Sequence, residues 1–165
     1  MSSPYYFAYG SNMNPARMRA RGLLFSSAET ARLEGYTLCF NKAAHNNPGV
    51  AYANVLPTHG GCVEGVLYRL GDVAAIAQMD HYEGTPVRYS RETLTVHTAA
   101  GSQRAWVYLA NPAYIRRGLL PQSRYLQHLL AGAEFLSPSY LEWLRSQPCH
   151  AVTEGCAQRG LQYND

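Results

Sequence analysis

The chain has 165 residues, of which 47% are hydrophobic and 15% are charged, a composition that belongs to one folded globular domain and excludes a disordered chain. The net charge is only +3, and the thirteen arginines and one lysine are scattered, which excludes the basic stripe of a nucleic-acid-binding face. The sequence has neither a signal-peptide pattern nor a membrane-spanning apolar run, so we expect a cytoplasmic protein with no membrane partner.

The first expected element is a buried strand that leads through a turn into a helix. Residues 5–9 are aromatic or apolar, which predicts the strand. Residues 10–12 (Gly-Ser-Asn) predict a tight turn with a positive φ at its glycine. Asn14 is the expected N-cap, Pro15 the first helical residue and Gly22 the stop. Outward N–H groups at such a turn favour a bound anion, although an ordinary strand–helix turn explains the pattern equally well.

The side chains that follow are interpreted as structural. Arg17, Arg19 and Arg21 lie in the first helix and are expected to form a solvated face, with phosphate binding as the alternative. Cys39 and Cys62 lie in strand-like runs and are interpreted as buried thiols.

Five strands are expected in the middle of the chain. Their alternating or β-branched patterns predict strands at 31–41, 50–56, 62–70, 87–97 and 103–110. Residues 57–61 contain a proline and two glycines, which predicts a loop between two of these strands. Gly65 interrupts the next strand, as is typical of a bulge or of a close approach by another backbone.

Three further helices complete the expected fold. Asp72 is the predicted N-cap of a helix with Val73 on its buried face and Gly84 as its stop. A second helix is expected at 122–135, and a third begins at Ser137, which a proline follows. Helices mixed with hairpin-joined strands predict an α+β fold, in which a curved or closed, mainly antiparallel sheet has helices outside it.

Near the end of the chain lies a group of residues that resembles a metal site. Cys149, His150 and Cys156 are close in sequence, but a convincing fourth ligand is missing. We interpret them as part of a polar tail at 149–165 that follows a single domain at 1–148, and we expect neither a metal nor a cofactor.

Glu83 is the second chemical feature of the sequence. It lies at the expected C-terminus of a helix, where the helix dipole opposes a negative charge. A carboxyl group in such a field tends towards a raised pKa, which suits a base that must later return a proton. On physical grounds alone, a solvated residue in the last helical turn is the favoured interpretation, and Asp80 and His81 are interpreted as surface residues.

The run Tyr-Phe-Ala-Tyr-Gly-Ser-Asn-Met at 6–13 resembles the Y-F-A-Y-G-S-N signature of the γ-glutamylcyclotransferases. Glu83 follows a helix and precedes a tyrosine-bearing strand, and in this it is similar to the catalytic glutamate of that family. The similarity continues through 62–68, Tyr89 and 121–125, and covers about residues 5–145. The glutathione-specific branch reads F-G-Y-G-S-L at the loop, so Asn12 points away from that branch.

The resemblance implies a small mixed, mainly antiparallel β-barrel with flanking helices. It also implies a reaction in which the α-amine of a γ-glutamyl group attacks its own γ-amide carbonyl, and 5-oxoproline and a free amine or amino acid are released without metal or cofactor. Glu83 would take a proton from the amine and pass it to the leaving nitrogen. The N–H groups of Gly10, Ser11 and Asn12 would hold either the α-carboxylate or the oxyanion, a choice that the sequence leaves open.

The resemblance also suggests which side chains bind the substrate. Tyr125 would donate a hydrogen bond to it, with packing as the alternative, and Tyr89 fits plain strand packing as well. The signature residues before the loop are included as substrate-binding candidates, although the tyrosines also fit a buried strand: Tyr6, Phe7, Ala8 and Tyr9. The leaving-group side of the pocket is expected to come from the loops at 45–49 and 111–121.

Three functions remain open at this stage. The chain is an enzyme for γ-glutamyl amino acids or peptides, an enzyme with the same mechanism for γ-glutamylated amines or natural products, or a non-catalytic module that binds γ-glutamyl groups. Glu83 argues against the third, because a binding module has little need of an acid there. The expected partner is a small γ-glutamyl molecule and not a nucleic acid, and a homodimer is one open form of assembly.

Overall fold

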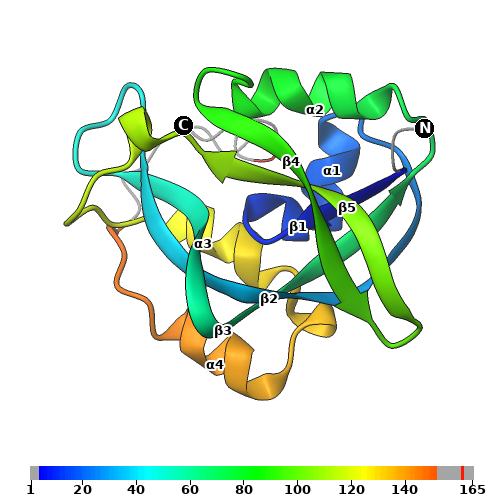
Figure 1. The fold of residues 1–165 in the computed structure, drawn as a ribbon. Helices are drawn as coiled ribbons and strands as arrows, with labels where there is room; N and C mark the ends of the chain where they lie inside the picture. Colours follow the sequence, from blue (N-terminus) through cyan, green and yellow to red (C-terminus); the bar gives the residue numbers. More distant parts are fainter. Residues whose placement is uncertain (1–3, 152–160, 162–165) are drawn as a thin grey trace.

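The computed structural model describes residues 4–151 and residue 161. Its strands form one closed barrel in the order β1-β3-β2-β4-β5, with helices outside it (Figure 1). The strands are β1 (Tyr5–Ala8), β2 (Phe25–Ala43), β3 (Ala51–Leu70), β4 (Tyr89–Thr98) and β5 (Gly101–Ala110). The α-helices are α1 (Pro15–Ala20), α2 (Ala75–Glu83), α3 (Ser123–Leu130) and α4 (Pro138–Arg145), and short 3-10 helices are η1 (Ser11–Met13), η2 (Pro112–Tyr114) and η3 (Ala133–Phe135). The expected α+β barrel with flanking helices is confirmed.

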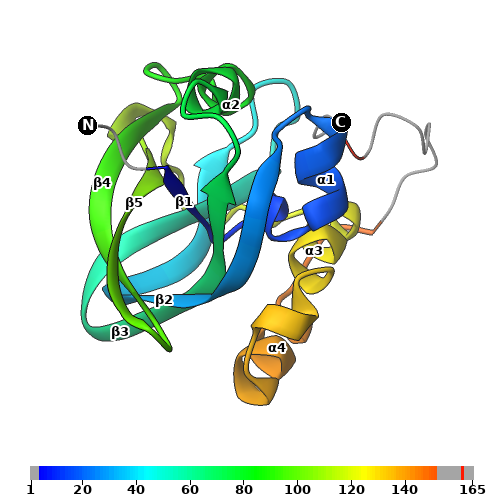
Figure 2. The same ribbon diagram turned by 90° about the vertical axis from the view of Figure 1, so that its right-hand side faces the viewer.

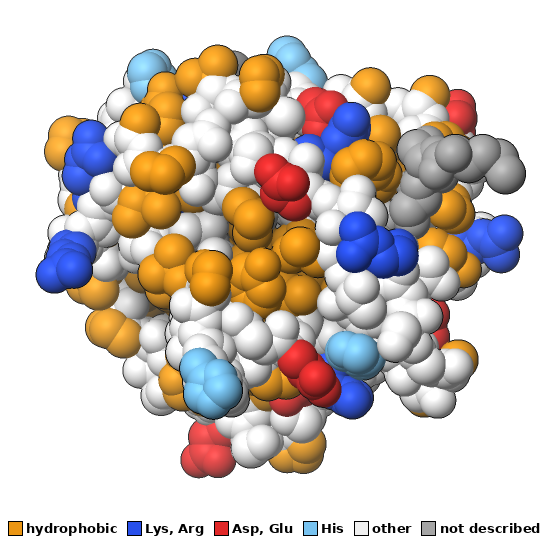
Figure 3. Space-filling view, in the orientation of Figure 1, with side chains coloured by type: hydrophobic (Ala, Val, Ile, Leu, Met, Phe, Trp, Pro, Cys, Tyr) orange, Lys and Arg blue, Asp and Glu red, His pale blue; other side chains and the backbone are white. Residues whose placement is uncertain are grey.

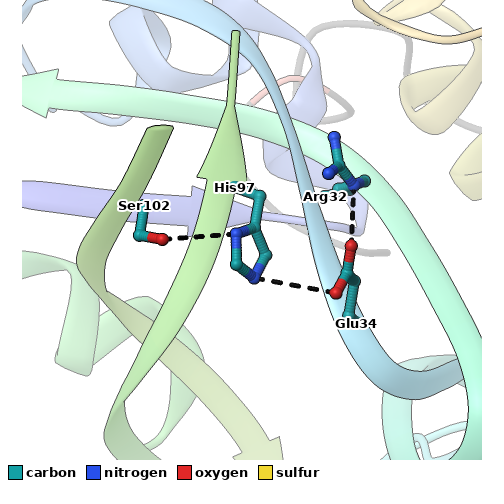
Figure 4. A network of polar contacts seen from close by, with 4 residues as sticks. All are labelled: Arg32, Glu34, His97 and Ser102. Carbon is teal, nitrogen blue, oxygen red and sulfur yellow. Dashed lines mark hydrogen bonds and ion pairs between the residues drawn. The ribbon is translucent and has the colours of Figure 1, made fainter. Parts of the chain in front are cut away.

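The barrel is mixed because β1 meets β5 in parallel, whereas β1–β3, β2–β3 and β4–β5 are antiparallel pairs. β2 and β4 close it through one register pair, Arg32 and His97, which we call the β2–β4 seam. Arg32 Nε donates to Glu34 at 3.0 Å, and the other oxygen of Glu34 lies 3.8 Å from His97 Nε2 (Figure 4). Ser102 Oγ lies 3.4 Å from His97 Nδ1. Side chains therefore supplement a seam that the backbone joins at one point.

The helices cover one end and one side of the barrel. In Figures 1 and 2, α2 crosses one end, and α3 and α4 lie on the side opposite the β4–β5 hairpin. As predicted, Asn14 is the N-cap of α1, where its Oδ1 accepts from the Ala16 N–H at 3.0 Å. Ser137 caps α4 in the same way, by accepting from the Tyr140 N–H at 3.3 Å. Gly84 ends α2 with a φ of 67°, in the left-handed region that favours glycine.

The predicted loop at 57–61 is wrong, because β3 runs through it. The pairing advances five residues on β3, from Pro57 to Cys62, while it advances two on β2, from Tyr36 to Glu34. The extra residues form an exposed bulge, where proline and glycine are tolerated because few ladder hydrogen bonds are required of them. The two predicted strands are therefore one long strand.

The start of α2 also differs from the prediction. The Oδ1 of Asp72 accepts from the Ala74 N–H at 2.8 Å, but it does so in a turn that precedes the helix, which begins at Ala75. Val73 lies in that turn and is 44% exposed, so it does not belong to the buried face. Only the later apolar residues of the pattern, Ile76 and Met79, are buried.

Arg17 of α1 and Arg21, the residue directly after the helix, are buried, contrary to the expected solvated face. Arg17 is 0% and Arg21 is 5% exposed, whereas Arg19 is exposed. A spacing of four places Arg17 and Arg21 on the same face of the helix, and this face points into the molecule. Arg17 Nη1 lies 3.1 Å from His128 Nε2 of α3, and Arg21 reaches the loop after β1.

β3 carries one confirmed prediction and one that is wrong. A Cβ at Gly65 would lie 2.3 Å from the carbonyl oxygen of Ala8 and 2.8 Å from the ring of Phe7, so the expected close approach is confirmed. Cys62, expected to be a buried thiol, is exposed, and Cys39 is only partly buried.

The first residues of the expected tail are held against the domain. The His150 N–H donates to the Pro121 carbonyl and the Ser123 N–H to the His150 carbonyl, each at 2.8 Å. Cys149 is exposed. Cys156 and most of the predicted tail lie outside the described residues.

On the face shown in Figure 3, hydrophobic side chains gather near the centre, and the Lys and Arg side chains are separated from one another. Within residues 4–151 and at residue 161, no helix has both the length and the apolar character needed to cross a membrane.

Candidate active site

A cavity of about 150 Å³ lies where η1 and α2 meet the strands and α3. Much of its wall is tyrosine, from six different elements or the turns beside them: Tyr6, Tyr9, Tyr52, Tyr82, Tyr89, Tyr108 and Tyr125. Arg21, Lys42 and Arg88 supply positive charge, and Glu83 is the carboxylate among the described residues that line it. A cavity of this volume holds a ring about the size of benzene.

The predicted turn at residues 10–12 lines the cavity, but its geometry differs from the prediction. Gly10 has a φ of −111°, so the expected positive φ is wrong. Glycine is favoured at this position because a side chain would be crowded: a Cβ would lie 3.2 Å from Tyr125 Oη and 3.3 Å from Ala53 Cβ. Met13 N–H donates to the Gly10 carbonyl at 3.0 Å, which folds the turn into η1. Among the described residues no acceptor is bonded to the N–H groups of residues 10–12, so three consecutive donors remain for an anion.

Asn12 connects this turn to the charged part of the wall. Its Oδ1 accepts from Arg21 Nη1 at 3.0 Å, and its carbonyl accepts from Tyr68 Oη at 2.6 Å. Its Nδ2 donates to Tyr6 Oη at 3.1 Å and lies 3.4 Å from Glu83 Oε1. These bonds fix a side chain that is 2% exposed, and they hold the turn beside the carboxylate.

Glu83 is half-buried at the end of α2 and lines the cavity. Burial raises the pKa of its carboxyl group above the usual 4.5, because this effect exceeds the opposing attraction of Arg21, Arg17 and Lys42. The solvated position favoured on sequence grounds is therefore wrong. A carboxyl group with a raised pKa can accept a proton from a ligand and return it.

Tyr125 and Tyr89 bond the backbone of one residue of β3, Ala53, from its two sides. The Ala53 N–H donates to Tyr125 Oη at 3.0 Å, and Tyr89 Oη donates to the Ala53 carbonyl at 2.8 Å. Burial raises the pKa of both phenols, so both keep their protons at neutral pH. The Tyr89 proton is used in the fold, whereas no acceptor for the Tyr125 proton is present among the residues described. Of these two hydroxyls, that of Tyr125 can therefore donate to a ligand.

Of the four signature residues before the turn, two line the cavity. Tyr6 and Tyr9 do so, and the Tyr9 hydroxyl also donates to a backbone carbonyl of β5. Phe7 and Ala8 are 0% and 1% exposed and belong to the core, so neither of them lines the cavity, contrary to the expectation. The reason is that β1 packs closely on β3 at Gly65, which takes up the Phe7 ring.

The two loops expected on the leaving-group side do not line the described cavity directly. Residues 45–49 contribute nothing to the described cavity wall, and 111–121 contributes indirectly through Tyr114, whose ring lies 5.8 Å from Lys42 Nζ. Lys42, Tyr52 and Arg88 also line the cavity, and the sequence did not indicate them. Lys42 lies just outside the strand predicted at 31–41, so no signal in the sequence indicated its burial.

Asp80 has a structural role next to the cavity and is not a free surface residue. Its Oδ1 accepts from Tyr108 Oη at 2.7 Å and its Oδ2 lies 3.0 Å from Arg91 Nη1, which fixes a tyrosine of the wall. His81 is exposed, as expected. In the part of the chain that the structure describes, no three His, Cys, Asp or Glu side chains are grouped closely enough to hold a metal ion.

The fold and the cavity together define a class of small mixed barrels in which a strand–turn–helix segment and a carboxylate at the end of a helix line the same cavity. Residues 6–128 match the family described as gamma-glutamyl cyclotransferase, AIG2-like, and the chain belongs to this family. The resemblance inferred from the sequence is confirmed at this level.

Solved structures show the same fold. A human protein described as uncharacterized protein loc79017 has a TM-score of 0.80 at 23% identity, over 94% of both chains. A gamma-glutamyl cyclotransferase has a TM-score of 0.79, also at 23% identity and over 94% of both chains. YkqA from Bacillus subtilis is 29% identical with a TM-score of 0.75, and the match covers 88% of this chain and 55% of YkqA. Comparison with curated protein sequences finds no significant match.

Proposed function

We propose that this protein is a γ-glutamyl cyclotransferase, which releases 5-oxoproline and a free amino acid or amine from a γ-glutamyl compound. The α-amine of the substrate attacks the γ-amide carbonyl, so that one C–N bond forms and closes a five-membered ring. The amide C–N bond then breaks. Water is not consumed, and the proton lost by the attacking amine ends on the leaving nitrogen.

The observation that carries this proposal is the position of Glu83 beside the turn. Glu83 Oε1 lies 3.4 Å from Asn12 Nδ2, and Asn12 belongs to the turn with three unbonded N–H groups. The base and the N–H groups that can bind an anion are thus close enough for one small substrate to contact both. Membership of the family supports the same reaction.

In the proposed reaction, each group does what its surroundings favour. Most of the substrate amine is protonated at neutral pH and has no free lone pair, so Glu83 takes its proton before the neutral amine attacks and later gives a proton to the leaving nitrogen. The N–H groups of residues 10–12 and the Tyr125 hydroxyl are donors for the oxyanion and the α-carboxylate. Loss of one oxyanion donor typically costs about 3 kcal/mol. The tyrosine wall restricts the γ-glutamyl chain to a folded shape from which the ring closes.

The test is Glu83→Gln, with Glu92→Gln as a matched control, because Glu92 is an exposed glutamate on β4. With γ-glutamyl-alanine as substrate, we expect 5-oxoproline formation to fall by about 10²–10⁴ in the first variant only. Wild-type turnover in Glu83→Gln would refute the role of Glu83. If the wild-type protein binds 5-oxoproline but forms none from a panel of γ-glutamyl amino acids and amines, it is a binding module and the proposal fails.

A further inference from the structure

Lys42 is a buried cation in the cavity wall that the reaction just described does not use. It is 2% exposed, and its Nζ lies 5.1, 5.4 and 5.8 Å from the ring centres of Tyr52, Tyr89 and Tyr114. Among the described residues, no carboxylate or carbonyl oxygen is bonded to this ammonium group. Three aromatic faces therefore hold a cation that lines the cavity and still has hydrogen-bond donors to offer.

This arrangement has a cost that core packing alone does not explain. Burial and the nearby Arg88 guanidinium lower the pKa of Lys42 from 10.5 to about 8 against the weaker attraction of Glu83, so the group is mostly charged at neutral pH although its surroundings oppose the charge. A buried ammonium group without an anion is unusual in proteins. The ammonium group is therefore available to an anion that enters the cavity.

The cavity has two cationic regions. Arg21 contacts Asn12 and, through its guanidinium at 4.8 Å from the ring centre, Tyr82. Lys42 instead contacts the three tyrosines named above, and Arg88 lies near it in the wall. Three cations against the single carboxylate of Glu83 suit a substrate with net negative charge. A γ-glutamyl amino acid carries two carboxylates and one ammonium group, whereas a γ-glutamyl amine carries one of each.

We propose that Lys42 binds the carboxylate of the leaving amino acid, and that the preferred substrates are therefore γ-glutamyl amino acids or peptides and not γ-glutamyl amines. This inference rests on the proposed function. It makes Lys42 a specificity-determining residue, and Arg88 supports it by adding positive charge to the same part of the wall.

Substrate chemistry distinguishes the leaving-group carboxylate from the α-carboxylate. The α-carboxylate and the attacking amine are attached to the same carbon, so the α-carboxylate stays near the base that takes the proton of the amine. Asn12 contacts Glu83 and is bonded to Arg21, whereas Lys42 attracts Glu83 without a hydrogen bond between them among the described residues. The carboxylate of the leaving amino acid extends from the far side of the amide, and the second cationic region around Lys42 is available to it.

The experiment compares γ-glutamyl-alanine with γ-glutamyl-ethylamine in wild type, Lys42→Met and Arg69→Met. The two substrates differ in the leaving-group carboxylate, and Arg69→Met removes one charge from an exposed position of β3 as a control. We expect Lys42→Met to lower kcat/KM for γ-glutamyl-alanine about 10- to 100-fold more than for γ-glutamyl-ethylamine, mainly through KM. The control should leave the ratio of the two values as in wild type.

Each other outcome has one meaning. An equal loss with both substrates would place Lys42 at the α-carboxylate and overturn the inference, and no loss with either would overturn it as well. Both results require turnover by the wild-type protein. If the wild type turns over no γ-glutamyl compound, the proposed function fails. If the wild type is active but the ratio of the two kcat/KM values is the same in Lys42→Met, only the role of Lys42 fails.

Discussion

The lone lysine of the chain should lower the stability of the folded protein, and Lys42→Met should reveal by how much. A fall of the pKa from 10.5 to about 8 corresponds to about 3 kcal/mol, at about 1.4 kcal/mol per tenfold change in proton affinity. The three ring contacts offset part of this, by about 0.5–1 kcal/mol each. Methionine has a similar length and packs well on aromatic rings. We therefore expect a net gain of about 1 kcal/mol at pH 7.

The dependence of this gain on pH follows from the sign of the pKa shift. Below about pH 8 Lys42 is charged in both states, so the folded state bears the full penalty. Between about pH 8 and 10.5 the folded protein loses the proton first, so the penalty fades as the pH rises. The advantage of Lys42→Met should be largest at neutral pH and should shrink above pH 8.

The assay is urea and thermal unfolding of wild type, Lys42→Met and the exposed control Arg69→Met, at pH 7 and at about pH 9.5. For a domain of this size, 1 kcal/mol corresponds to a melting temperature about 2–4 °C higher. The control should change by less than about 0.5 kcal/mol at either pH. A Lys42→Met protein that is less stable than wild type at pH 7, or whose advantage does not shrink with pH, would refute the reasoning.

Three further predictions concern the cavity and the barrel. Burial raises the pKa of Glu83, and the base acts in its carboxylate form, so kcat/KM should fall as the pH drops through a midpoint above 4.5. A pH–rate profile with its midpoint at or below 4.5 would contradict this prediction. Tyr125→Phe leaves the buried Ala53 N–H without its acceptor, so both the unfolding free energy and kcat/KM should fall, the former by about 1–3 kcal/mol; an unchanged denaturation midpoint would count against the bond. Gly65→Ala places a Cβ 2.3 Å from the Ala8 oxygen, so the unfolding free energy measured by urea denaturation should fall by more than about 2 kcal/mol. A variant with wild-type stability would show that β1 and β3 can move apart to accept the methyl group.

The features that the sequence predicted well are those that neighbouring residues decide. Asn14 and Ser137 accept hydrogen bonds from N–H groups two or three residues later, and Gly84 adopts its φ at the end of its own helix. Such caps depend on short side chains and local backbone conformation, which a sequence displays directly. The signature at 6–13 likewise located the turn that lines the cavity.

The features that were missed depend on contacts between distant segments. Lys42 is buried because rings from β3, β4 and η2 converge on it, and nothing near residue 42 indicates this. Arg21 was assigned to solvent because α1 is too short for its pattern to show which face packs, and its partner Asn12 is in another element. The proline at 57 suggested a loop, since the bulge that accommodates it is a property of the paired strand.

The β2–β4 seam has a consequence for local opening of the barrel. Since one register pair closes it and β1 meets β5 at one pair as well, the β4–β5 hairpin is a candidate cooperative unit for partial opening, separate from the β1–β3–β2 unit. The cavity lies across this division: β2 supplies Lys42 and β4 supplies Tyr89, whose hydroxyl binds the Ala53 carbonyl of β3. A ligand that spans both sides would fasten the two units together, and slower amide hydrogen exchange in β4 and β5 on binding would be its signature.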